Sequence, residues 1–325
     1  MRAREDLPPG DLNYLRYLLR WAVNECSERR VANPSSPRNL DSATTRLVKR
    51  IAAALLVRLP IDILAPLNLK LRLGPHLVLL CKSTITLELW RDSLRRETEY
   101  MTIQQLASLG ETYVDVGANV GFTVLAALRR DCESAIFPSN VIAFEPNLRL
   151  FRIMRKNIEM NAASKVNLDL RPVAVGHSIG SGYLEDKDDQ GKVKPTLGGI
   201  KVSVTTLDNV CQSVVSIGLL KVDVEGSEFE VLSGAKETMK KCSAIQFEVT
   251  PERGRPIDES VGPLLELVRS SGFSLYTLQA QTLHALDPKK NVDKHHFNVL
   301  ALRSAKHCIA QFGWRCDGEV MQLPR

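Results

Sequence analysis

The stretch Tyr113-Val-Asp-Val-Gly-Ala-Asn-Val-Gly-Phe-Thr123 decides the fold. Its β-favouring residues carry one acid, Asp115, and lead into Gly117 and Gly121. An apolar, helix-compatible run then extends from Phe122 to Leu128, so the stretch predicts a strand, a tight turn and a helix start. Glycine lets the backbone turn sharply and lets a ligand come close, and the helix start offers unpaired N–H groups. Asp115 would lie at the carboxyl end of the strand, where open α/β sheets bind ligands.

The spacing of the glycines separates two kinds of ligand. A dinucleotide-binding turn has the pattern G-x-G-x-x-G, whereas this chain has D-x-G-x-x-x-G. A carboxylate at the turn is poorly suited to a pyrophosphate, but it suits a ligand with an ammonium group and no phosphate, such as S-adenosylmethionine. The alternative is an ordinary βα loop, because short glycine motifs also arise by chance.

A second motif favours the nucleoside ligand. Val141-Ile-Ala-Phe-Glu-Pro-Asn147 is a short apolar run that ends in an acid. In nucleotide-binding βαβ units, the acid after the second strand accepts hydrogen bonds from the ribose, and Glu145 has that type and place. Pro146 ends the strand because it has no N–H, and its ring could lie against an adenine. The alternative is a solvated turn at Glu145-Pro-Asn.

These two motifs, together with Thr205-Thr-Leu-Asp208 and Lys221-Val-Asp-Val-Glu-Gly-Ser-Glu228, resemble the FkbM family of S-adenosylmethionine-dependent methyltransferases. The resemblance covers about residues 99–303. It implies a class I methyltransferase fold: a Rossmann-like α/β domain with a seven-stranded, mostly parallel sheet, helices on both faces and an antiparallel last strand. It also implies S-adenosylmethionine as cofactor. The cofactor-binding candidates are Asp115, Gly117, Ala118, Asn119, Gly121, Phe122, Thr123, Glu145 and Pro146.

The fourth expected strand carries the candidate catalytic residues. Lys221, Asp223 and Glu225 alternate with apolar residues, so they would share one side as the strand ends. Asp223 or Glu225 could take the acceptor's proton, orient its hydroxyl or hold a cation, and Lys221 could pair with Asp223 and lower its basicity. The alternative is that both acids are structural and bind N–H groups of the turn. Glu248, on the fifth strand, is a weaker candidate for the same pocket.

Around the motifs, the β/α alternation predicts the remaining elements. We expect a third strand over 166–175, an exposed loop or hairpin over 187–199 and a helix over 227–240. Strands at 273–278 and 297–302 would close the sheet as an antiparallel pair. The domain boundaries are residues 1–98 for an N-terminal α+β extension, 99–303 for the methyltransferase domain and 304–325 for a C-terminal tail. Within the extension we expect a helix at 12–27, a linker at 31–42 and small strands at 77–80 and 84–89.

The charge and cysteine content of the chain limit the kinds of partner and site that we expect. The whole formal net charge of +6 lies in residues 1–100, so the remainder of the chain is neutral and nucleic acid is not a predicted partner. The segment 46–67 has basic flanks and is too short and interrupted to span a bilayer. It could form a helix that lies on a membrane surface or, alternatively, a helix that packs on the catalytic domain. Seven scattered cysteines without C-x-x-C, and no apolar leader, predict a cytoplasmic protein without a metal site.

The sequence therefore predicts an enzyme that methylates a small acceptor. The family resemblance implies that the methyl group goes to a hydroxyl oxygen of a sugar or secondary metabolite. The alternative is a non-catalytic scaffold that docks to a membrane or partner through its basic N-terminal segment. His177 and His284 are open as acceptor-site bases, although a lone histidine is more often a surface residue. The adjacent His295 and His296 would point to opposite sides of a strand, which is poor metal geometry.

Overall fold

The computed structural model describes residues 70–73, 76–79, 97–128, 138–161, 166–185, 193–194, 199–251, 256–289 and 296–317. The chain divides into two compact units, Met1–Glu97 and Thr98–Arg325. In the first, β1 (Lys70–Leu73) and β2 (His76–Leu79) form an antiparallel hairpin. The predicted strand at 77–80 overlaps β2. The predicted strand at 84–89, the helix at 12–27 and the linker at 31–42 lie outside the described residues.

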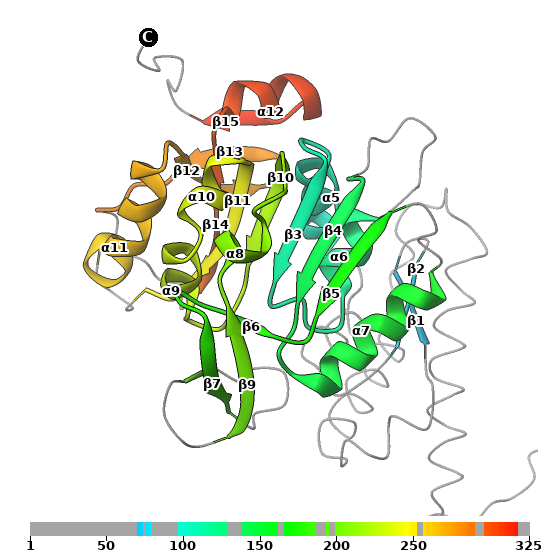
Figure 1. Cartoon of the computed structure of the whole chain (residues 1–325). Coiled ribbons are helices and arrows are strands. Elements are labelled where there is room, and N and C mark those ends of the chain that lie inside the picture. Colours follow the sequence, from blue (N-terminus) through cyan, green and yellow to red (C-terminus); the bar gives the residue numbers. More distant parts are fainter. Residues whose placement is uncertain are drawn as a thin grey trace, which may run out of the picture. The chain divides into compact units, whose positions relative to one another are not determined.

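A nine-stranded sheet, here called the main sheet, organises the second unit, in the order β15-β13-β12-β14-β11-β10-β3-β4-β5 (Figure 1). Its strands are β3 (Thr112–Val116), β4 (Asn140–Phe144), β5 (Asn167–Arg171), β10 (Ile217–Val222), β11 (Cys242–Val249), β12 (Ser274–Gln279), β13 (Thr282–Ala285), β14 (Phe297–Leu302) and β15 (Arg315–Asp317). Strands β5, β4, β3, β10 and β11 pair in parallel, and β14 runs antiparallel between β11 and β12. The predicted class I arrangement with an antiparallel closing strand is confirmed.

The predicted number of seven strands is wrong, because β13 and β15 extend the edge beyond β12. β12 and β13 form a hairpin whose turn residues Ala280 and Gln281 have φ values of 45° and 63°. Neither residue is the glycine or asparagine that usually marks such a turn. β15 then adds in parallel to β13, so part of the predicted C-terminal tail belongs to the sheet.

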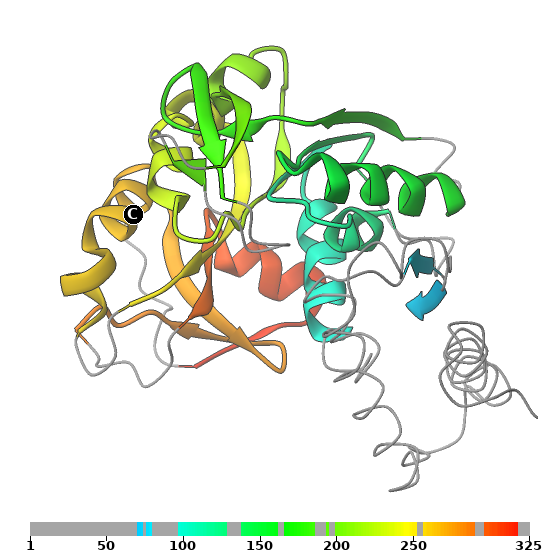
Figure 2. The same cartoon turned by 90° about the horizontal axis from the view of Figure 1, so that it is seen from below.

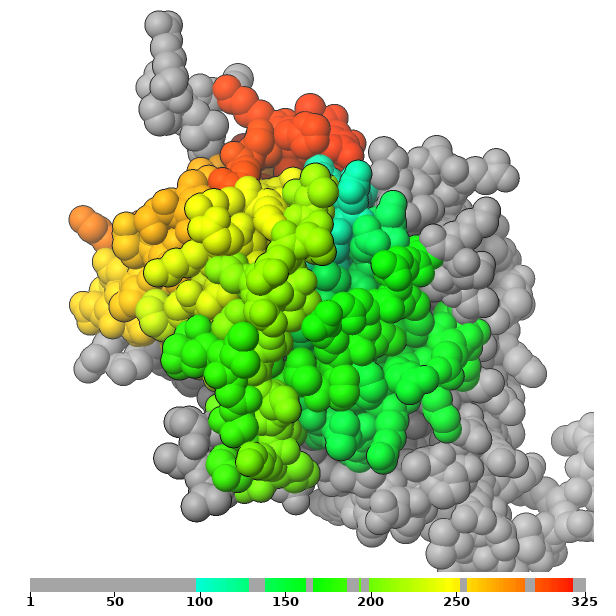
Figure 3. Space-filling view, in the orientation of Figure 1, coloured from blue at the N-terminus to red at the C-terminus, as the bar shows by residue number. Residues whose placement is uncertain are grey.

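Helices cover both faces of the main sheet. They are α5 (Glu97–Ala107), α6 (Phe122–Ala127), α7 (Leu148–Met160), α8 (Leu207–Val210), α9 (Glu228–Ser233), α10 (Lys236–Lys240), α11 (Ile257–Ser270) and α12 (Ala305–Phe312). Figures 1 and 2 show α5 and α6 on the face opposite to α8 and α10. In the space-filling view, the segments from α7 to α10 largely cover the face toward the viewer (Figure 3). In the described part of the chain, no helix is long and apolar enough to cross a membrane.

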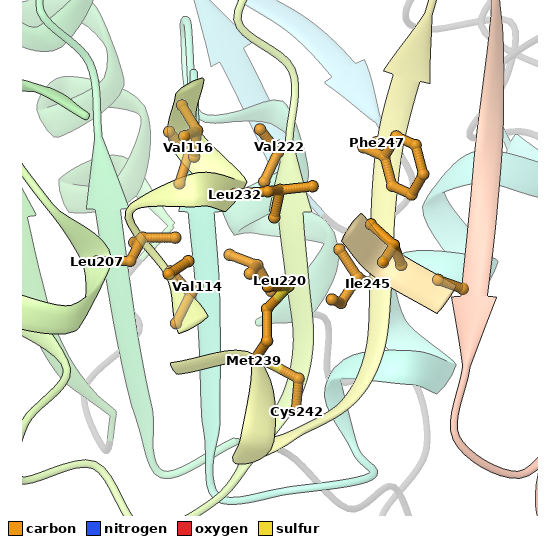
Figure 4. Close-up of a cluster of buried hydrophobic side chains, with 14 of the residues drawn as sticks. Val114, Val116, Leu207, Leu220, Val222, Leu232, Met239, Cys242, Ile245 and Phe247 are labelled. Carbon is orange, nitrogen blue, oxygen red and sulfur yellow. The ribbon is translucent and has the colours of Figure 1, made fainter. Parts of the chain in front are cut away.

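A hydrophobic core lies between the sheet and helices α8 to α11. Alternate residues of β3 and β10 point into it, among them Val114, Val116, Leu220 and Val222, because strand side chains change faces at every step (Figure 4). The residues between them, such as Tyr113 and Leu219, are fully buried on the other face. A strand buried on both faces has only its ends free for a ligand, which places the candidate site at the carboxyl edge.

The predicted third strand over 166–175 is also wrong in extent. It divides into β5, in the main sheet, and β6 (Ala174–Val175), which pairs with β9 in a second, four-stranded sheet. Pro172 stands between them and has no N–H to continue the ladder. This small sheet also contains β7 (Gly180–Leu184), β8 (Val193–Lys194) and β9 (Ile200–Thr205). β7 and β9 extend beyond the end where the β3 and β4 arrows point (Figure 1).

The predicted helix over 227–240 is two helices, α9 and α10, which meet at Gly234 and Ala235. A Cβ added to Gly234 would lie 2.3 Å from the backbone oxygen of Gly176, so the break brings the chain against the end of β6. Only glycine allows this approach.

Candidate active site

The turn after β3 takes the backbone shape that its glycines predict. Gly117, Asn119 and Gly121 have φ values of 85°, 51° and 83°, in the left-handed region that favours glycine and tolerates asparagine. The backbone N–H groups of Gly117 and Ala118 donate to the Phe144 oxygen at 3.0 and 2.9 Å. The turn is therefore fixed to the end of β4, which lies within the second motif.

Asp115 is a fully buried acid behind this turn. Its Oδ2 accepts a hydrogen bond from the Thr123 hydroxyl, while its Oδ1 has no partner among the described residues. The Tyr113 hydroxyl is close enough to affect the pKa of Asp115, yet it also lacks a partner of normal geometry. Burial raises the pKa of Asp115, and the charge of Lys221 opposes that rise. A buried carboxylate oxygen without a donor is costly unless a ligand supplies one.

Glu145, 6 % exposed, ties the turn to the following helix. Its Oε2 accepts from the Asn119 N–H and its Oε1 from the Asn147 N–H, both at 2.8 Å. Asn147 in turn caps α7 by accepting from the N–H groups of its first residues. A carboxylate oxygen can accept more than one hydrogen bond, so these two contacts are compatible with a ligand hydroxyl at Glu145. Pro146, next in the chain, is half-buried.

Other predicted cofactor residues lie inside the domain. The Ala118 and Phe122 side chains are 2 % and 1 % exposed, and the Phe122 ring packs edge to face on Tyr100, with 5.7 Å between centroids. Thr123 is buried and bonded to Asp115. Ala118 and Phe122 would therefore contact a ligand chiefly through their backbone.

An ion pair between a buried lysine and a partly exposed acid lies beside this turn, at the end of β10. Lys221 is 4 % exposed, and its Nζ lies 2.9 Å from the Asp223 Oδ2. In the sheet register, Lys221 lies between Asp115 on β3 and Gln246 on β11. Burial by itself would lower the pKa of Lys221, but the charges of Asp223 and Asp115 raise it above its usual value. The lysine is therefore a fixed cation that joins the acids of two neighbouring strands.

The turn after β10 is held by an acid that the sequence did not single out. Oε1 of Glu228, which is 5 % exposed, accepts from the N–H groups of Val224 and Gly226, both at 3.1 Å. Glu225 has a φ of 57° and Gly226 a φ of 97°. Glu228 thus binds N–H groups of this turn, which is the structural role considered above for Asp223 and Glu225. The sequence gives only a partial signal, an acid in the first turn of a helix after a glycine, and this signal does not exclude Asp223 or Glu225 from the same role.

Glu248 is half-buried near the end of β11. Burial raises its pKa to about 7, and the nearby acids Asp223, Glu225 and Glu228 add to the effect. The Asp223 side chain is 38 % exposed and Glu225 is half-buried, so this end of β10 and β11 is open to solvent. Together these acids make the edge of the sheet strongly negative.

The third motif, Thr205-Thr-Leu-Asp208, is structural. The Thr206 hydroxyl accepts from the Asn209 N–H and caps α8. The Asp208 carboxylate accepts from the N–H groups of Glu237 and Thr238 and from the Thr238 hydroxyl, which fixes the start of α10. The motif therefore seats two helices on the core.

Among the described residues, no histidine makes a hydrogen bond or ion pair with these acids through its side chain. His177 and His296 are exposed, and His295 lies outside the described residues. The His284 Nδ1 lies 2.9 Å from the Asp317 Oδ2, in a contact between β13 and β15 at the sheet's edge. Among the residues that the structure describes, no group of three or more potential ligands could hold a metal ion.

Comparison with known proteins agrees with this geometry. Residues 115–275 match the family model described as the methyltransferase FkbM domain. A curated relative, "Methyltransferase 1" of Beauveria bassiana (strain ARSEF 2860), is 30% identical over 148 residues, which cover 37% of this chain and 57% of the relative. The chain thus spans little more than half the length of that relative.

Solved structures of similar shape include other methyltransferases. Methyltransferase FkbM from Methylobacillus flagellatus KT has a TM-score of 0.38 and 16% identity, covering 79% of this chain and 59% of that one. The SAM-dependent methyltransferase from Agrobacterium tumefaciens has a TM-score of 0.41 and 8% identity, covering 72% and 70%. The N-terminal domain of EvdMO1, crystallised in the presence of SAH and D-fucose, has a TM-score of 0.37 and 9% identity, covering 63% and 81%.

The assignment rests on the family match and on the strand order of the main sheet. The matched segment begins at Asp115, the buried acid of the glycine turn, and includes both Glu145 and the strand with Lys221 and Asp223. Through residues 115–275, the chain belongs to the family of methyltransferase FkbM domains.

Proposed function

We propose that the chain is an S-adenosylmethionine-dependent methyltransferase that transfers a methyl group to a hydroxyl of a small acceptor, a sugar or secondary metabolite. One observation carries the proposal. Within an FkbM domain, the fully buried Asp115 keeps an unpartnered Oδ1 beside a left-handed glycine turn at the carboxyl edge of the sheet. A ligand with an ammonium group would supply the missing donor.

The residues of the turn fit the cofactor's parts. Asp115 and Asn119 each have a buried side-chain oxygen without a partner, and they would hold the amino-acid end with the turn from Gly117 to Gly121. Glu145 would accept from the ribose hydroxyls, and Pro146 would lie against the adenine. When bound, S-adenosylmethionine supplies a strongly electrophilic methyl group. The protein then needs to place the acceptor and receive its proton.

The acids after β10 are the candidates for placing the acceptor. Asp223 and Glu225 would orient the acceptor hydroxyl at the open edge of the sheet. Lys221 is buried and paired with Asp223, so we assign it a positioning role. It would keep the Asp223 carboxylate ionised and fixed in direction.

Calorimetric titration with S-adenosylhomocysteine tests the proposal, with NAD as the control ligand. We expect micromolar binding of the first and none of the second. Asp115→Asn should weaken binding about tenfold to a hundredfold, because it removes a charge-assisted hydrogen bond worth about 1.5–3 kcal/mol. Asp258→Asn, on the exposed start of α11, is the matched control.

Absence of binding by the folded wild-type chain, or equal affinity of the Asp115→Asn variant, would refute the cofactor site. A binding-competent chain then goes into a screen with labelled methyl donor. The acceptor panel consists of free sugars, D-fucose among them, and of hydroxylated aromatic compounds. Transfer to none of them, with the cofactor bound, would count against the acceptor class.

A further inference from the structure

Glu248 lies beside Asp223, but the two acids differ in the charged groups that surround them. In the register of β10 and β11, Lys221 is opposite Gln246 and Val222 opposite Phe247. β10 ends there, and extending the register by one residue sets Asp223 beside Glu248. Side chains alternate along a strand, which puts Glu248 on the same side of the sheet as Gln246 and Asp223. Neighbouring parallel strands are about 4.8 Å apart, so the two carboxyl groups are close neighbours.

The charges that face Glu248 are mostly negative. Asp223, Glu225 and Glu228 approach from β10 and the turn that follows it, and Lys221 is the cation that acts on it. On its other side, β14 places the uncharged Asn298 directly opposite. Among the described residues, the Glu248 side chain has no ion pair or hydrogen bond. Asp223, in contrast, is paired with Lys221 at 2.9 Å.

This difference separates the two acids chemically. An acid that is paired with a buried ammonium group holds its charge and is a weak base. Burial and three neighbouring acids raise the pKa of Glu248 to about 7. At neutral pH it is then partly ionised and can both take up a proton and release it, which is what a general base requires.

We infer that Glu248 accepts the proton of the acceptor hydroxyl, while the Lys221-bound Asp223 orients that hydroxyl. The inference rests on the proposed function. In the transfer, the acceptor oxygen forms a bond to the methyl carbon and its O–H bond breaks, the proton passing to the Glu248 carboxylate. The electron pair of the broken carbon–sulfur bond stays on sulfur as a neutral thioether. Glu248, half-exposed, then returns the proton to solvent.

The first test detects the charge of Glu248 from ligand binding alone, without a methyl acceptor. S-adenosylmethionine carries a sulfonium charge that S-adenosylhomocysteine lacks, so the ratio of their dissociation constants reports a carboxylate near the reacting methyl group. From pH 5.5 to pH 8, preference for the charged ligand should rise about fivefold in the wild type, as Glu248 ionises. The preference should be nearly constant in Glu248→Gln. Glu266→Gln, exposed on α11, should behave as the wild type.

The second test shifts the pH at which the ligand preference changes, by altering the charge opposite Glu248. Asn298→Asp places a like charge opposite Glu248, where cross-strand Cβ atoms lie about 4.5–5.5 Å apart, and Asn298→Lys places an opposite one. The midpoint of the pH transition should shift by about half a pH unit, upward with Asp and downward with Lys. A merely structural role of Glu248 would not produce shifts of opposite sign.

The outcomes are separable. If neither ligand binds, the proposed function fails. If both bind and their ratio changes equally with pH in the wild type and in Glu248→Gln, the inference fails and the proposed function stands. With any acceptor that the wild type methylates, Glu248→Gln should lower kcat about a hundredfold or more, while the KM for S-adenosylmethionine rises by no more than about the fivefold that the first test measures. An unchanged kcat would also overturn the inference.

Discussion

At the scale of single residues, the carboxylate of Glu228 fixes the turn that carries two candidate site acids. Glu228→Ala would leave the part-buried N–H groups of Val224 and Gly226 without their acceptor, at a cost of about 1–3 kcal/mol of unfolding free energy. Glu228→Gln keeps an acceptor oxygen and should lose less. Urea denaturation measures both, with Glu230→Ala on the exposed side of α9 as control. Equal loss in the control and in Glu228→Ala would contradict this role.

The pKa of Glu248 also predicts a pH dependence of stability. A carboxyl group whose pKa rises on folding, here from 4.5 to about 7, binds its proton more tightly when folded. Its contribution to stability is therefore present below pH 4.5 and lost as the pH rises to about 7. Allowing for solvent screening, Glu248→Gln should be about 1–2 kcal/mol more stable than the wild type at pH 8.

Melting curves of the two proteins at pH 5 and pH 8 check this prediction. The advantage of the glutamine variant should appear at pH 8 and be small at pH 5, where the wild-type group is already protonated. A difference between the two proteins that does not change with pH would show that the Glu248 carboxyl group titrates in the ordinary range.

Candidate residues of the site could be predicted from the sequence where a motif implies a particular chemistry. Asp115 and Glu145 could be chosen because an acid at the end of a strand, beside a glycine turn, has few other uses. Glu228 could not be chosen as the residue that holds the turn, because Asp223, Glu225 and Glu228 are one chemical type in a single motif. Only the hydrogen bonds of the folded chain separate them.

At the scale of elements, Gly117 joins β3 and β10 by close backbone contact. A Cβ at this position would lie 1.9 Å from the Asp223 backbone oxygen, and its φ of 85° is unfavourable for other residues. Gly117→Ala should therefore prevent stable folding or displace the end of β10. Gly180→Ala is the matched control, since nothing lies within 4 Å of the added Cβ. Circular dichroism and ligand binding compare the two, and a normally folded Gly117→Ala protein that still binds would contradict the prediction.

Asp208 makes a comparable link between helices. It accepts from Glu237 and Thr238 at the start of α10, so Asp208→Ala removes a cap and should cost about 1–2 kcal/mol of unfolding free energy. Asp208→Asn retains one acceptor oxygen and should recover part of the loss in a urea titration. A role of Asp208 in the site alone would instead change ligand affinity and leave the unfolding midpoint where it is.

Element prediction succeeded where a hydrophobic pattern had one explanation. The β/α alternation gave the parallel strands and the antiparallel pair that closes them. It failed at Pro172 and at Gly234, which divide a predicted strand and a predicted helix. Both residues are known breakers, but whether the chain resumes in the same element is decided by packing. At Gly234 the deciding contact is the Gly176 backbone, 58 residues earlier in the chain.

At the scale of the whole second unit, residues 304–317 complete the fold at the edge opposite to the candidate site. Figure 1 shows α12 and β15 at the far end from the β3 and β4 arrowheads. Trp314 is 2 % exposed, its Nε1 donates to the Gln105 Oε1 of α5 at 3.0 Å, and its ring packs on Phe312. The C-terminal segment therefore contributes core surface to the main sheet.

Trp314→Ala should lower the free energy of unfolding by about 3–5 kcal/mol, because it empties a buried aromatic site. Trp314→Phe keeps most of the buried area and loses the hydrogen bond, so about 1 kcal/mol is expected. Since the segment lies away from the acids of the site, the fraction that stays folded should bind S-adenosylhomocysteine with wild-type affinity. An unchanged denaturation midpoint in Trp314→Ala would mean that residues 304–325 are a dispensable tail. Lost affinity in a folded Trp314→Phe protein would instead mean that this edge of the sheet and the site are coupled.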